Sequence, residues 1–478
     1  MVQGTGSGVG KSWLCTGLCR LLARRGLRVA PFKAQNMANN AAVVPGGGEI
    51  GRAQAVQAEA ARVAPTVDMN PILIKPVAHT RAQLVVRGQV VGNQEARDYW
   101  RDTSALWALV AESYDRVAAD ADVVVLEGAG SPAEFNLRDR DLVNMRMALY
   151  ADAKVLLAGD IDKGGVFASF LGTLEFLTPA ERALVAGFVI NRFRGDEALL
   201  HPAPAQFAAR TGIPVRGVIP MRRDIVIDRE DDPADLVGGA GLLDVAVVRF
   251  ATVSNFTDLE PLARTPGVAL RWVADAEAVG NPDLLVLPGC KDTLAERRRL
   301  REVGLDRAIV AAARRGIPVL GLCGGYQLLG RTLRDEAGVG GASGVDAGLG
   351  LLPVDTWFGA DKRTVAARGQ TRGGWVLPPG LAVDGYEIHQ GRTAGPGPGL
   401  VGLEGGDDGA VAGVVAGTYA HGFFDGGALR SALVDALRER RGLDPLGAVI
   451  PDAAAERERH YDALAELLEA RLDLGGLV

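Results

Sequence analysis

The sequence predicts an α/β protein built from two successive units, each with a parallel sheet. Short apolar runs that end in glycine or acidic turns alternate with amphipathic stretches, which is the pattern of strands and the helices that cover them. Two of these runs lead into glycine turns that carry a chemically active residue type, Lys11 in the first half and Cys323 in the second. With 478 residues and 48% hydrophobic content, the chain can bury the cores of two or three domains.

Composition excludes several classes of partner. The net charge of -6 gives no electrostatic reason to bind nucleic acid or an anionic membrane surface. No apolar run approaches the roughly 18 residues that a membrane span requires, and the chain does not start like a secretory signal. The four cysteines show no paired metal spacing. We therefore expect a cytoplasmic protein with no nucleic-acid or membrane partner.

The first element is a phosphate loop. Gly4-Thr-Gly-Ser-Gly-Val-Gly-Lys-Ser12 follows a very short apolar start and precedes an amphipathic stretch over residues 13–24. Backbone N–H groups of such a loop and the following helix terminus cradle phosphates, while its lysine reaches the β and γ oxygens and its serine binds Mg²⁺. A flexible glycine turn is the alternative, which Gly-Lys-Ser at a helix start disfavours. The predicted nucleotide contacts are Gly8, Gly10, Lys11 and Ser12. Because so few residues precede the loop, we expect a short first strand or a chain that begins further upstream.

Polar residues follow the next predicted strands, at residues 26–37 and 68–76. Loops at the carboxyl ends of strands line the sites of open α/β sheets. These loops carry Lys33, Gln35, Asn36, Asn70 and Lys75. The lysines could be solvated surface charges, but their position at strand ends favours anion and substrate binding.

Acidic residues close two further strands. The apolar strand at residues 122–130 reaches Glu127, the arrangement by which phosphate-loop enzymes hold Mg²⁺ through a carboxylate. The strand at residues 151–158 leads to Asp160, which could be a second metal ligand or, equally well, a helix cap. A later strand ends at Asn191.

A charged and then glycine-rich stretch at residues 222–242 indicates a linker. We place an ATP-binding domain at residues 1–235, a second α/β domain at 243–440 and a helical tail at 441–478. One charged helix is expected over residues 294–315. The tail helix, over residues 452–474, is expected to pack on the second domain.

The second unit centres on a buried strand, a glycine turn and a helix, starting at Pro318-Val-Leu-Gly-Leu-Cys323. Cys323 is thereby held at the carboxyl end of the strand. A free cysteine is only a few per cent thiolate at neutral pH, so it needs a base nearby, and His421 stands out. The alternative is a small buried apolar cysteine. Glu387 and His389 share one face of a strand, where either could orient His421 or contact the partner domain, with structural hydrogen bonds as an equal alternative.

The segment Gly-Leu-Cys323-Gly-Gly-Tyr-Gln resembles the nucleophile segment of class I glutamine amidotransferases, and Thr-Tyr-Ala-His421-Gly resembles their histidine segment. The resemblance implies that the Cys323 thiolate attacks the glutamine side-chain amide, that His421 shuttles the proton, and that ammonia is released. It also implies an oxyanion and glutamine site at Gly289, Gly324 and Gln327. Phe423 stands where many members carry glutamate. We therefore expect a Cys–His pair, with any third member supplied elsewhere.

The first half resembles the dethiobiotin synthetase-like ATPases, which implies an adenine contact for Asn191. The fusion of both halves resembles the cobyric acid synthase family, through segments such as Pro31-Phe-Lys-Ala-Gln-Asn-Met37, Asp68-Met-Asn-Pro71 and Tyr386-Glu-Ile-His389. That resemblance implies ATP- and glutamine-dependent amidation of the b, d, e and g carboxylates of adenosylcobyrinic a,c-diamide, giving adenosylcobyric acid in cobalamin biosynthesis. It implies ATP and Mg²⁺, a corrinoid substrate and no tightly bound prosthetic group.

Two other functions stay open at this point. The sister enzyme, cobyrinic acid a,c-diamide synthase, shares both domain types. A nucleotide-dependent regulatory or binding ATPase with an inactive amidotransferase domain is the alternative of another class. The intact Cys323 and His421 speak against the second alternative.

Overall fold

The structure, a computed structural model, describes residues 1–76, 81–95, 103–228, 230, 238–239 and 241–477. Much of the predicted linker, at residues 229, 231–237 and 240, lies outside the described residues. Two compact units are present, and both have the predicted α/β architecture. The first comprises Met1–Ala38, Glu49–Asp228 and Arg457–Val478, and the second comprises Asn39–Gly48 and Arg229–Glu456.

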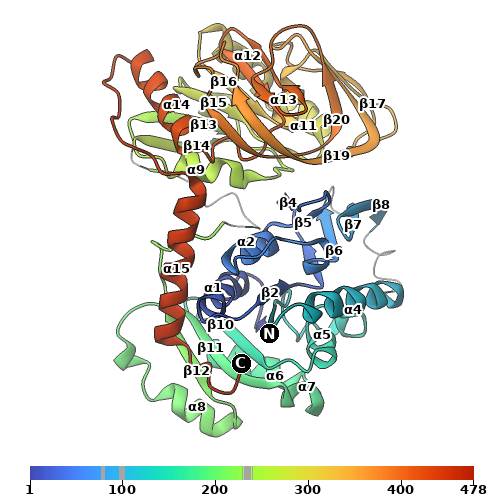
Figure 1. Cartoon of the computed structure of the whole chain (residues 1–478), viewed down its shortest axis with the longest axis vertical. Coiled ribbons are helices and arrows are strands. Elements are labelled where there is room, and N and C mark those ends of the chain that lie inside the picture. Colours follow the sequence, from blue (N-terminus) through green and yellow to red (C-terminus); the bar gives the residue numbers. More distant parts are fainter. Residues whose placement is uncertain (77–80, 96–102, 229, 231–237, 240, 478) are drawn as a thin grey trace. The chain divides into compact units, whose positions relative to one another are not determined.

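The first unit is organised around a parallel sheet (Figure 1). Its strands β1, β10, β11 and β12 pair in that order and span Val2–Gly4, Val155–Asp160, Val185–Phe193 and Val215–Pro220. β2 (Val29–Phe32) pairs in parallel with β9 (Val123–Leu126), and an isolated parallel bridge between Val2 and Glu127 joins the end of β9 to β1. All six strands therefore present their carboxyl ends at one edge, where ligands bind in open α/β sheets.

Helices cover both faces of this sheet. On one face α1 (Lys11–Arg24) packs against strand residues such as Leu156, and on the other α6 (Val166–Glu175) packs against residues such as Leu157. The alternation of Leu156 and Leu157 between two cores is the period of two that a strand buried on both faces requires. The predicted phosphate-loop helix is confirmed as α1.

A smaller mixed sheet completes the first unit. β3 (Gln35–Met37) pairs in parallel with β6 (Ile72–Pro76), which continues antiparallel through β7 (Arg81–Val86) to β8 (Gln89–Glu95). The loop with Lys33 thus leads directly into a paired strand. The remaining elements are β5 (Glu49–Gly51), α2 (Arg52–Ala60), η1 (Val67–Met69), α4 (Ser104–Ala119), η2 (Phe135–Arg140), α5 (Met145–Tyr150), α7 (Pro179–Ala183), η3 (Glu197–Leu199) and α8 (Ala203–Thr211).

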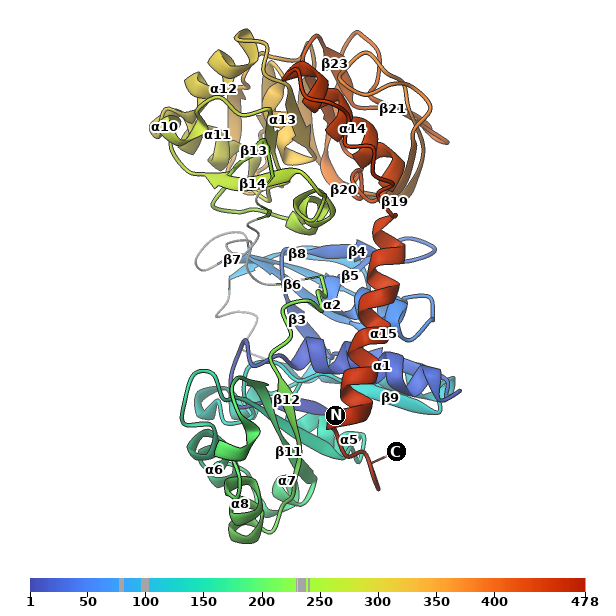
Figure 2. The same ribbon diagram turned by 90° about the vertical axis from the view of Figure 1, so that its left-hand side faces the viewer.

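The second unit contains a six-stranded sheet, of which β13, β14 and β23 are labelled in Figure 2. Its order is β14–β13–β15–β16–β24–β23, and β23 alone is antiparallel to its neighbour. The strands span, in that order, Val268–Val273, Leu243–Val248, Leu284–Leu287, Val319–Leu322, Val415–Thr418 and Ala410–Ala412. Leu285 faces the core beneath α11 (Thr293–Glu302), whereas Leu284 faces the core beneath α14 (Gly427–Arg440). The sheet is again buried on both faces.

A second sheet in this unit has the order β18–β17–β19–β21–β22, and β20 pairs with β19. The strands span Thr332–Asp335 (β17), Gly344–Ala347 (β18), Asp355–Thr371 (β19), Ala382–Ala394 (β20), Val401–Leu403 (β21) and Gly406–Asp408 (β22). The remaining elements are β4 (Ala41–Val43), η5 (Phe256–Leu259), α9 (Glu260–Ala263), α10 (Ala276–Val279), α12 (Leu305–Arg314) and α13 (Gly324–Leu329). The helices of the described residues include none that is long and apolar enough to cross a bilayer.

The charged stretch at residues 294–315 forms two helices, α11 and α12, so the prediction of one helix is wrong. Gly304 separates them with φ at 73°, in the left-handed region that glycine adopts at little cost. The hydrophobic residues Leu300 and Leu305, on either side of the break, are both fully buried. The break lets each helix turn its own apolar face to the core.

The tail helix, α15 (Ala453–Arg471), differs from the prediction in what it packs against. Its residues up to Glu456 belong to the second unit, whereas those from Arg457 onward belong to the first. In the first unit Leu464 and Leu468 lie in the same core as α1, and both views show the two helices side by side (Figures 1 and 2). A Cβ atom on Gly17 of α1 would lie 2.5 Å from Leu468 Cδ1. The absence of a side chain at Gly17 therefore permits this close approach.

Charge pairing fixes the same contact. Arg20 of α1 is fully buried, donates to Asp462 Oδ1 at 2.9 Å, and forms an ion pair with Glu458. A buried guanidinium is costly unless carboxylates pair with it. Because α15 follows the second domain in sequence, we expected it to pack there. Its acidic residues instead pair with Arg20 of α1.

We expect Leu468→Ala to lower the unfolding free energy of the first unit by about 3 kcal/mol, because it leaves a cavity in a fully buried core. Denaturant unfolding followed by circular dichroism measures the effect. Glu469→Ala is the matched control, since its partly exposed ion pair with Arg25 contributes at most about 1 kcal/mol. Equal midpoints for the two variants would show that α15 does not pack on α1.

Candidate active site

The predicted phosphate loop lies between β1 and α1, at the carboxyl edge of the first sheet. Gly8 and Gly10 have φ values of 71° and 97°, so the loop uses the left-handed backbone that glycine tolerates. A Cβ atom on Gly10 would also lie 2.3 Å from Asn191 Nδ2. The loop therefore depends on glycine at position 10 for both backbone conformation and space.

Lys11 and Asn191 are both engaged by this loop. Lys11 Nζ donates to the carbonyl oxygens of Gly6 at 2.9 Å and Gly130 at 3.0 Å, across the mouth of the loop. Asn191 Nδ2 donates to the carbonyl of Val9 at 2.8 Å, and the side chain is buried. The structure thus gives Asn191 a contact that holds the loop, and the adenine contact stays a prediction.

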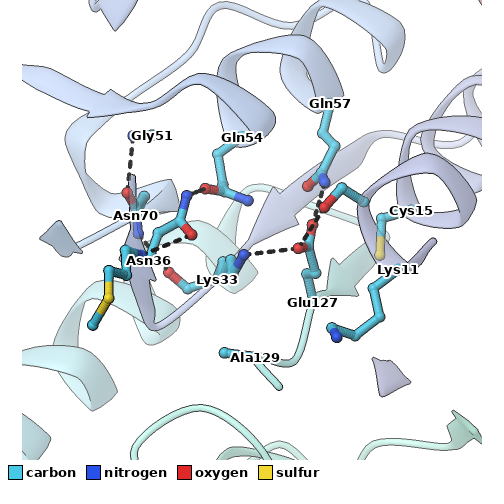
Figure 3. Close-up of polar contacts among 12 residues, drawn as sticks. Lys11, Cys15, Lys33, Asn36, Gly51, Gln54, Gln57, Asn70, Glu127 and Ala129 are labelled. Carbon is cyan, nitrogen blue, oxygen red and sulfur yellow. Dashed lines mark hydrogen bonds and ion pairs between the residues drawn. The ribbon is translucent and has the colours of Figure 1, made fainter. Parts of the chain in front are cut away.

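Glu127 is the centre of a buried polar cluster beside the loop (Figure 3). Its Oε1 accepts hydrogen bonds from Ser12 Oγ and Lys33 Nζ, both at 2.8 Å, and its Oε2 accepts from Gln57 Nε2 at 2.5 Å. Lys33 follows β2, Gln57 lies on α2, and Ser12 is in the first turn of α1. Three separate elements therefore converge on one carboxylate.

Glu127 stays ionised in this environment. Burial by itself would raise the pKa of its carboxyl, but the charge of Lys33 and the hydrogen bonds from Lys33, Gln57 and Ser12 outweigh burial and lower the pKa below its usual value. A buried, charged oxygen ligand 2.8 Å from a serine hydroxyl is the donor set that Mg²⁺ prefers. Ser12 and Glu127 therefore fit a magnesium site.

Asp160 lies at the end of β10 but has other partners. Its Oδ2 accepts from Arg192 at 2.9 Å, and its Oδ1 accepts from the backbone N–H of Asp162 at 3.0 Å. Within the described part of the chain, no hydrogen bond joins Asp160 to Ser12 or Glu127, and no three His, Cys, Asp or Glu residues are grouped as metal ligands. Asp160 is thus tied to Arg192 and to the turn after β10, and its role as a metal ligand stays a prediction.

The predicted substrate residues divide into two groups. Lys33, Gln35 and Asn36 follow β2 and begin β3, and all three side chains are buried. Asn36 Nδ2 donates to Gln54 Oε1 of α2 at 3.1 Å, beside the Glu127 cluster (Figure 3). This loop therefore lies next to the phosphate loop, as a substrate loop must.

Asn70 and Lys75 are instead occupied by the fold. Asn70 Nδ2 donates to the carbonyls of Lys33 and Ile72, and its Oδ1 accepts from the N–H of Gly51. Lys75 Nζ, almost fully buried, donates to Glu49 Oε2 at 2.7 Å. A buried ammonium already neutralised by a carboxylate is not the open anion site that the strand-end position of Lys75 predicts.

In the second unit, Cys323 occupies the sharp turn between β16 and α13. Its φ of 49° is a conformation that costs a non-glycine residue free energy, and strain of this kind is typical of nucleophile turns. Its N–H donates to the carbonyl of Thr418 on the neighbouring strand β24, and its own carbonyl accepts from Gln327. The fold thus holds the thiol at the carboxyl edge of the sheet.

The turn after β15 lies directly against the turn that carries Cys323. A Cβ atom on Gly324 would fall 2.5 Å from Cys290 Sγ and 2.9 Å from Cys290 N. A Cβ atom on Gly289 would fall 2.8 Å from the carbonyl oxygen of Ser254. Backbone therefore approaches backbone around the nucleophile. Burial raises the pKa of Cys290 well above its usual value, so this second thiol stays protonated.

His421 has a carboxylate partner that the sequence did not reveal. Its Nδ1 lies 2.6 Å from Asp258 Oδ2, and Asp258 Oδ1 accepts from the N–H of Gly422 at 3.0 Å. Asn255 Nδ2 is 3.3 Å from His421 Nε2, and the ring of Tyr386 stacks on the imidazole at 5.1 Å between centroids. The imidazole is fixed from several sides.

Electrostatics keep this histidine charged. Burial would lower the pKa of His421, but the charge of Asp258, a hydrogen bond to it, and the interaction with Cys323 raise the pKa to about 10. Cys323, His421 and Asp258 therefore form one interacting set.

Of the roles left open for Glu387 and His389, their contacts in the structure match the structural one. Glu387 forms an ion pair with Arg363 and lies 3.6 Å from His389, while His389 stacks on Tyr419 at 3.6 Å between centroids. Gln327 is buried and is held by Thr293 at 2.8 Å and by Tyr419 at 3.1 Å. These residues pack beside the turn that carries Cys323. The carboxylate that contacts His421 Nδ1 is Asp258.

Comparison with known proteins decides the family. Residues 1–233 match the family described as the CobQ/CobB/MinD/ParA nucleotide binding domain, and residues 244–429 match the CobB/CobQ-like glutamine amidotransferase domain. A protein of Sorangium cellulosum named cobyric acid synthase is 50% identical over 99% of this chain and 96% of its own length. The chain belongs to the cobyric acid synthase family. A protein of Desulforudis audaxviator with the same name is 51% identical over 99% of this chain and 97% of its own.

Membership of the cobyric acid synthase family confirms the resemblance that the motifs indicated. The motifs did not point to Asp258, because it lies 163 residues from His421 and in no recognised pattern. The available signal was position alone: Asn255-Phe-Thr-Asp258 follows β13, and polar residues after parallel strands gather at one edge of the sheet. Gln54 and Gln57, one turn apart on α2, were missed because glutamines on an alanine-rich helix resemble a solvated face.

Proposed function

We propose that this protein is a glutamine-hydrolysing amide ligase that uses ATP to amidate the b, d, e and g carboxylates of adenosylcobyrinic a,c-diamide. Identity of 50% over nearly the whole length of a cobyric acid synthase is the observation that carries this proposal. The two clusters at the carboxyl edges of the two parallel sheets support it, because one is suited to phosphate chemistry and the other to amide hydrolysis.

The first unit would activate the carboxylate. A carboxylate is a poor electrophile, so it must receive a phosphoryl group before an amine can displace its oxygen. Lys11 would exchange its two carbonyl contacts for the β and γ oxygens of ATP, and the N–H groups of the loop would hold the same phosphates. Lys33, Gln35 and Asn36 would line the acceptor side, next to the ionised Glu127.

A magnesium ion would be held by Ser12 and Glu127. Bound there, it would neutralise charge that develops on the transferring phosphoryl group. Lys33 keeps Glu127 ionised and ready to act as a ligand. Asn191 and Gly10 would hold the loop in its phosphate-binding shape.

The second unit would supply ammonia from glutamine. The Cys323 thiolate attacks the side-chain amide carbon, and the backbone N–H groups at Gly324 and the Gly289 turn stabilise the oxyanion. His421, charged before attack, donates its proton to the leaving nitrogen, and water then releases glutamate. Ammonia is far more nucleophilic than ammonium, so we infer that it reaches the activated carboxylate before solvent protonates it.

The experiment that tests this function is an assay of the purified protein with ATP, Mg²⁺ and glutamine on two candidate corrinoids. We expect adenosylcobyrinic a,c-diamide to be converted to the fully amidated cobyric acid, as seen by mass spectrometry of the product. We expect unamidated cobyrinic acid to be a poor substrate. Selective conversion of cobyrinic acid to its a,c-diamide would instead identify the sister activity.

A glutaminase assay separates the remaining alternative. Release of glutamate from glutamine is expected, because Cys323, His421 and Asp258 are assembled as one set. An ATP-binding protein that neither hydrolyses glutamine nor modifies a corrinoid would be a regulatory ATPase, and the proposal would be wrong.

A further inference from the structure

We propose that Asp258 is the positioning residue for His421, taking the place of the glutamate that other amidotransferases of this class carry after their histidine. This inference rests on the proposed glutamine hydrolysis and assigns the third member of its machinery. It concerns a residue in the loop after β13, in a part of the chain far from both the cysteine and the histidine segments.

The geometry shows a two-point contact. Asp258 Oδ2 lies 2.6 Å from His421 Nδ1, and Oδ1 accepts the N–H of Gly422, the residue after the histidine. One carboxylate therefore fixes both the ring and the backbone that carries it. Both side chains are at least 95% buried, so water does not compete for these bonds.

The loop that carries Asp258 is itself held in place. Asn255 begins η5 in a left-handed conformation with φ at 50°, which puts Asp258 in the single turn of η5. Asn255 Oδ1 accepts the N–H of Ala41, and Asn40 Oδ1 accepts the N–H of Phe256. These contacts come from the segment 39–48, which belongs to the second unit although it comes from the first part of the chain.

The residue at the usual glutamate position is committed elsewhere. Phe423 is 1% exposed and packs in the hydrophobic core beneath α14, so neither its chemistry nor its direction could serve His421. A carboxylate from η5 reaches the imidazole from another element. Where the resemblance implied a pair of Cys323 and His421, Asp258 supplies the third member of the set.

The chemical consequence concerns the proton on Nδ1. Because Asp258 Oδ2 accepts a hydrogen bond from His421 Nδ1, Nδ1 keeps its hydrogen, and Nε2 is the nitrogen that exchanges a proton with Cys323 and the leaving ammonia. Asp258→Asn would present an amide N–H to Nδ1 and favour the opposite tautomer. The titratable groups that face His421 are Asp258 from η5, Cys323 from the turn after β16 and Tyr386 from β20.

The test is the glutaminase rate of Asp258→Asn across pH. We expect kcat to fall by about 10²-fold or more with KM for glutamine little changed, as for the equivalent swap in a serine protease. We also expect the alkaline limb of the plot of kcat against pH to move to lower pH, because losing the carboxylate lowers the pKa of His421. Asp258→Glu, which keeps the charge, should recover part of kcat and move the limb back.

Asp335→Asn is the matched control. It also removes a buried carboxylate that binds backbone N–H groups, those of Val339 and Gly340, but Asp335 has no contact with His421. Its kcat and pH profile should equal those of the wild type. Amidation from ammonia should persist in Asp258→Asn and shows that the chain is folded.

The role of Asp258 and the proposed glutamine hydrolysis can fail separately. An active wild-type glutaminase whose kcat and alkaline limb are unchanged by Asp258→Asn overturns the role of Asp258 but leaves the proposed function standing. A wild type without glutaminase overturns the function itself. If the variant does not fold, NMR titration of His421 in the wild type decides: an imidazolium that persists toward about 10 agrees with the carboxylate partner, and one that titrates near 6.5 refutes it.

Discussion

Cys323→Ala is expected to abolish amidation from glutamine while leaving amidation from high ammonia intact. The variant removes the nucleophile of the second unit and touches nothing in the phosphate-loop cluster of the first. Loss of a nucleophile of this kind costs at least about 10³-fold in kcat. The measurement is the initial rate of ATP-dependent corrinoid amidation with each nitrogen source.

Cys19→Ala is the matched control for this variant. Cys19 is also fully buried, but it lies in the hydrophobic core of the first unit, and burial raises the pKa of its thiol well above its usual value. Both nitrogen sources should support near-normal rates in this control. Equal loss of both activities in Cys323→Ala would refute the division of labour between the two units.

Lys11→Ala is expected to remove amidation from either nitrogen source, by about 10³-fold. Lys11 is the lysine whose ammonium donates to the carbonyl oxygens of Gly6 and Gly130 at the phosphate loop. The acyl group is then never activated, and the origin of the ammonia becomes irrelevant. Hydrolysis of glutamine itself does not need Lys11, so glutamate release should outlast amide formation.

The control is Lys154→Ala, a lysine that is exposed and precedes β10. It should amidate with both nitrogen sources at wild-type rates. Persistence of ammonia-driven amidation in Lys11→Ala would mean that the loop is not where the phosphoryl group is transferred.

Much of the local structure follows from short-range pattern. The apolar run before Cys323 and the glycines around it predict a strand, a tight turn and a helix, and these are β16 and α13. The Gly-Lys-Ser sequence predicts α1 and its loop in the same way. In both places the decisive information lies within about ten residues, because backbone conformation and strand period are local properties.

The parts that pattern did not reveal depend on contacts between distant residues. Asp258 reaches His421 across 163 positions, Lys75 finds Glu49 across 26, and α15 leaves its sequence neighbours to pair with Arg20. A carboxylate in a loop has the same local signature whether it caps a turn or orients a histidine. Only the folded arrangement of strand ends distinguishes these roles.

Glu127 and Glu387 show that sequence position does not reveal the partner of a charged side chain. Glu127 follows β9 as the sequence predicts, and its role as a metal ligand stays a prediction, but the sequence did not reveal that Lys33 and Gln57 would hold it. Glu387 was chosen because it shares a strand face with His389, yet Arg363 is the residue that neutralises it. A local pattern predicts which strand carries a charged residue, but it does not predict which distant residue pairs with it.

We expect the nitrogen released at Cys323 to become the amide nitrogen formed by the phosphate-loop unit. The most direct measurement supplies glutamine labelled at its amide nitrogen, with ATP and adenosylcobyrinic a,c-diamide, and follows label, glutamate and ADP together. We predict that every new corrin amide carries the label and that one glutamate and one ADP appear for each. Unlabelled amides, or label released as ammonia without ADP formation in step, would contradict the account.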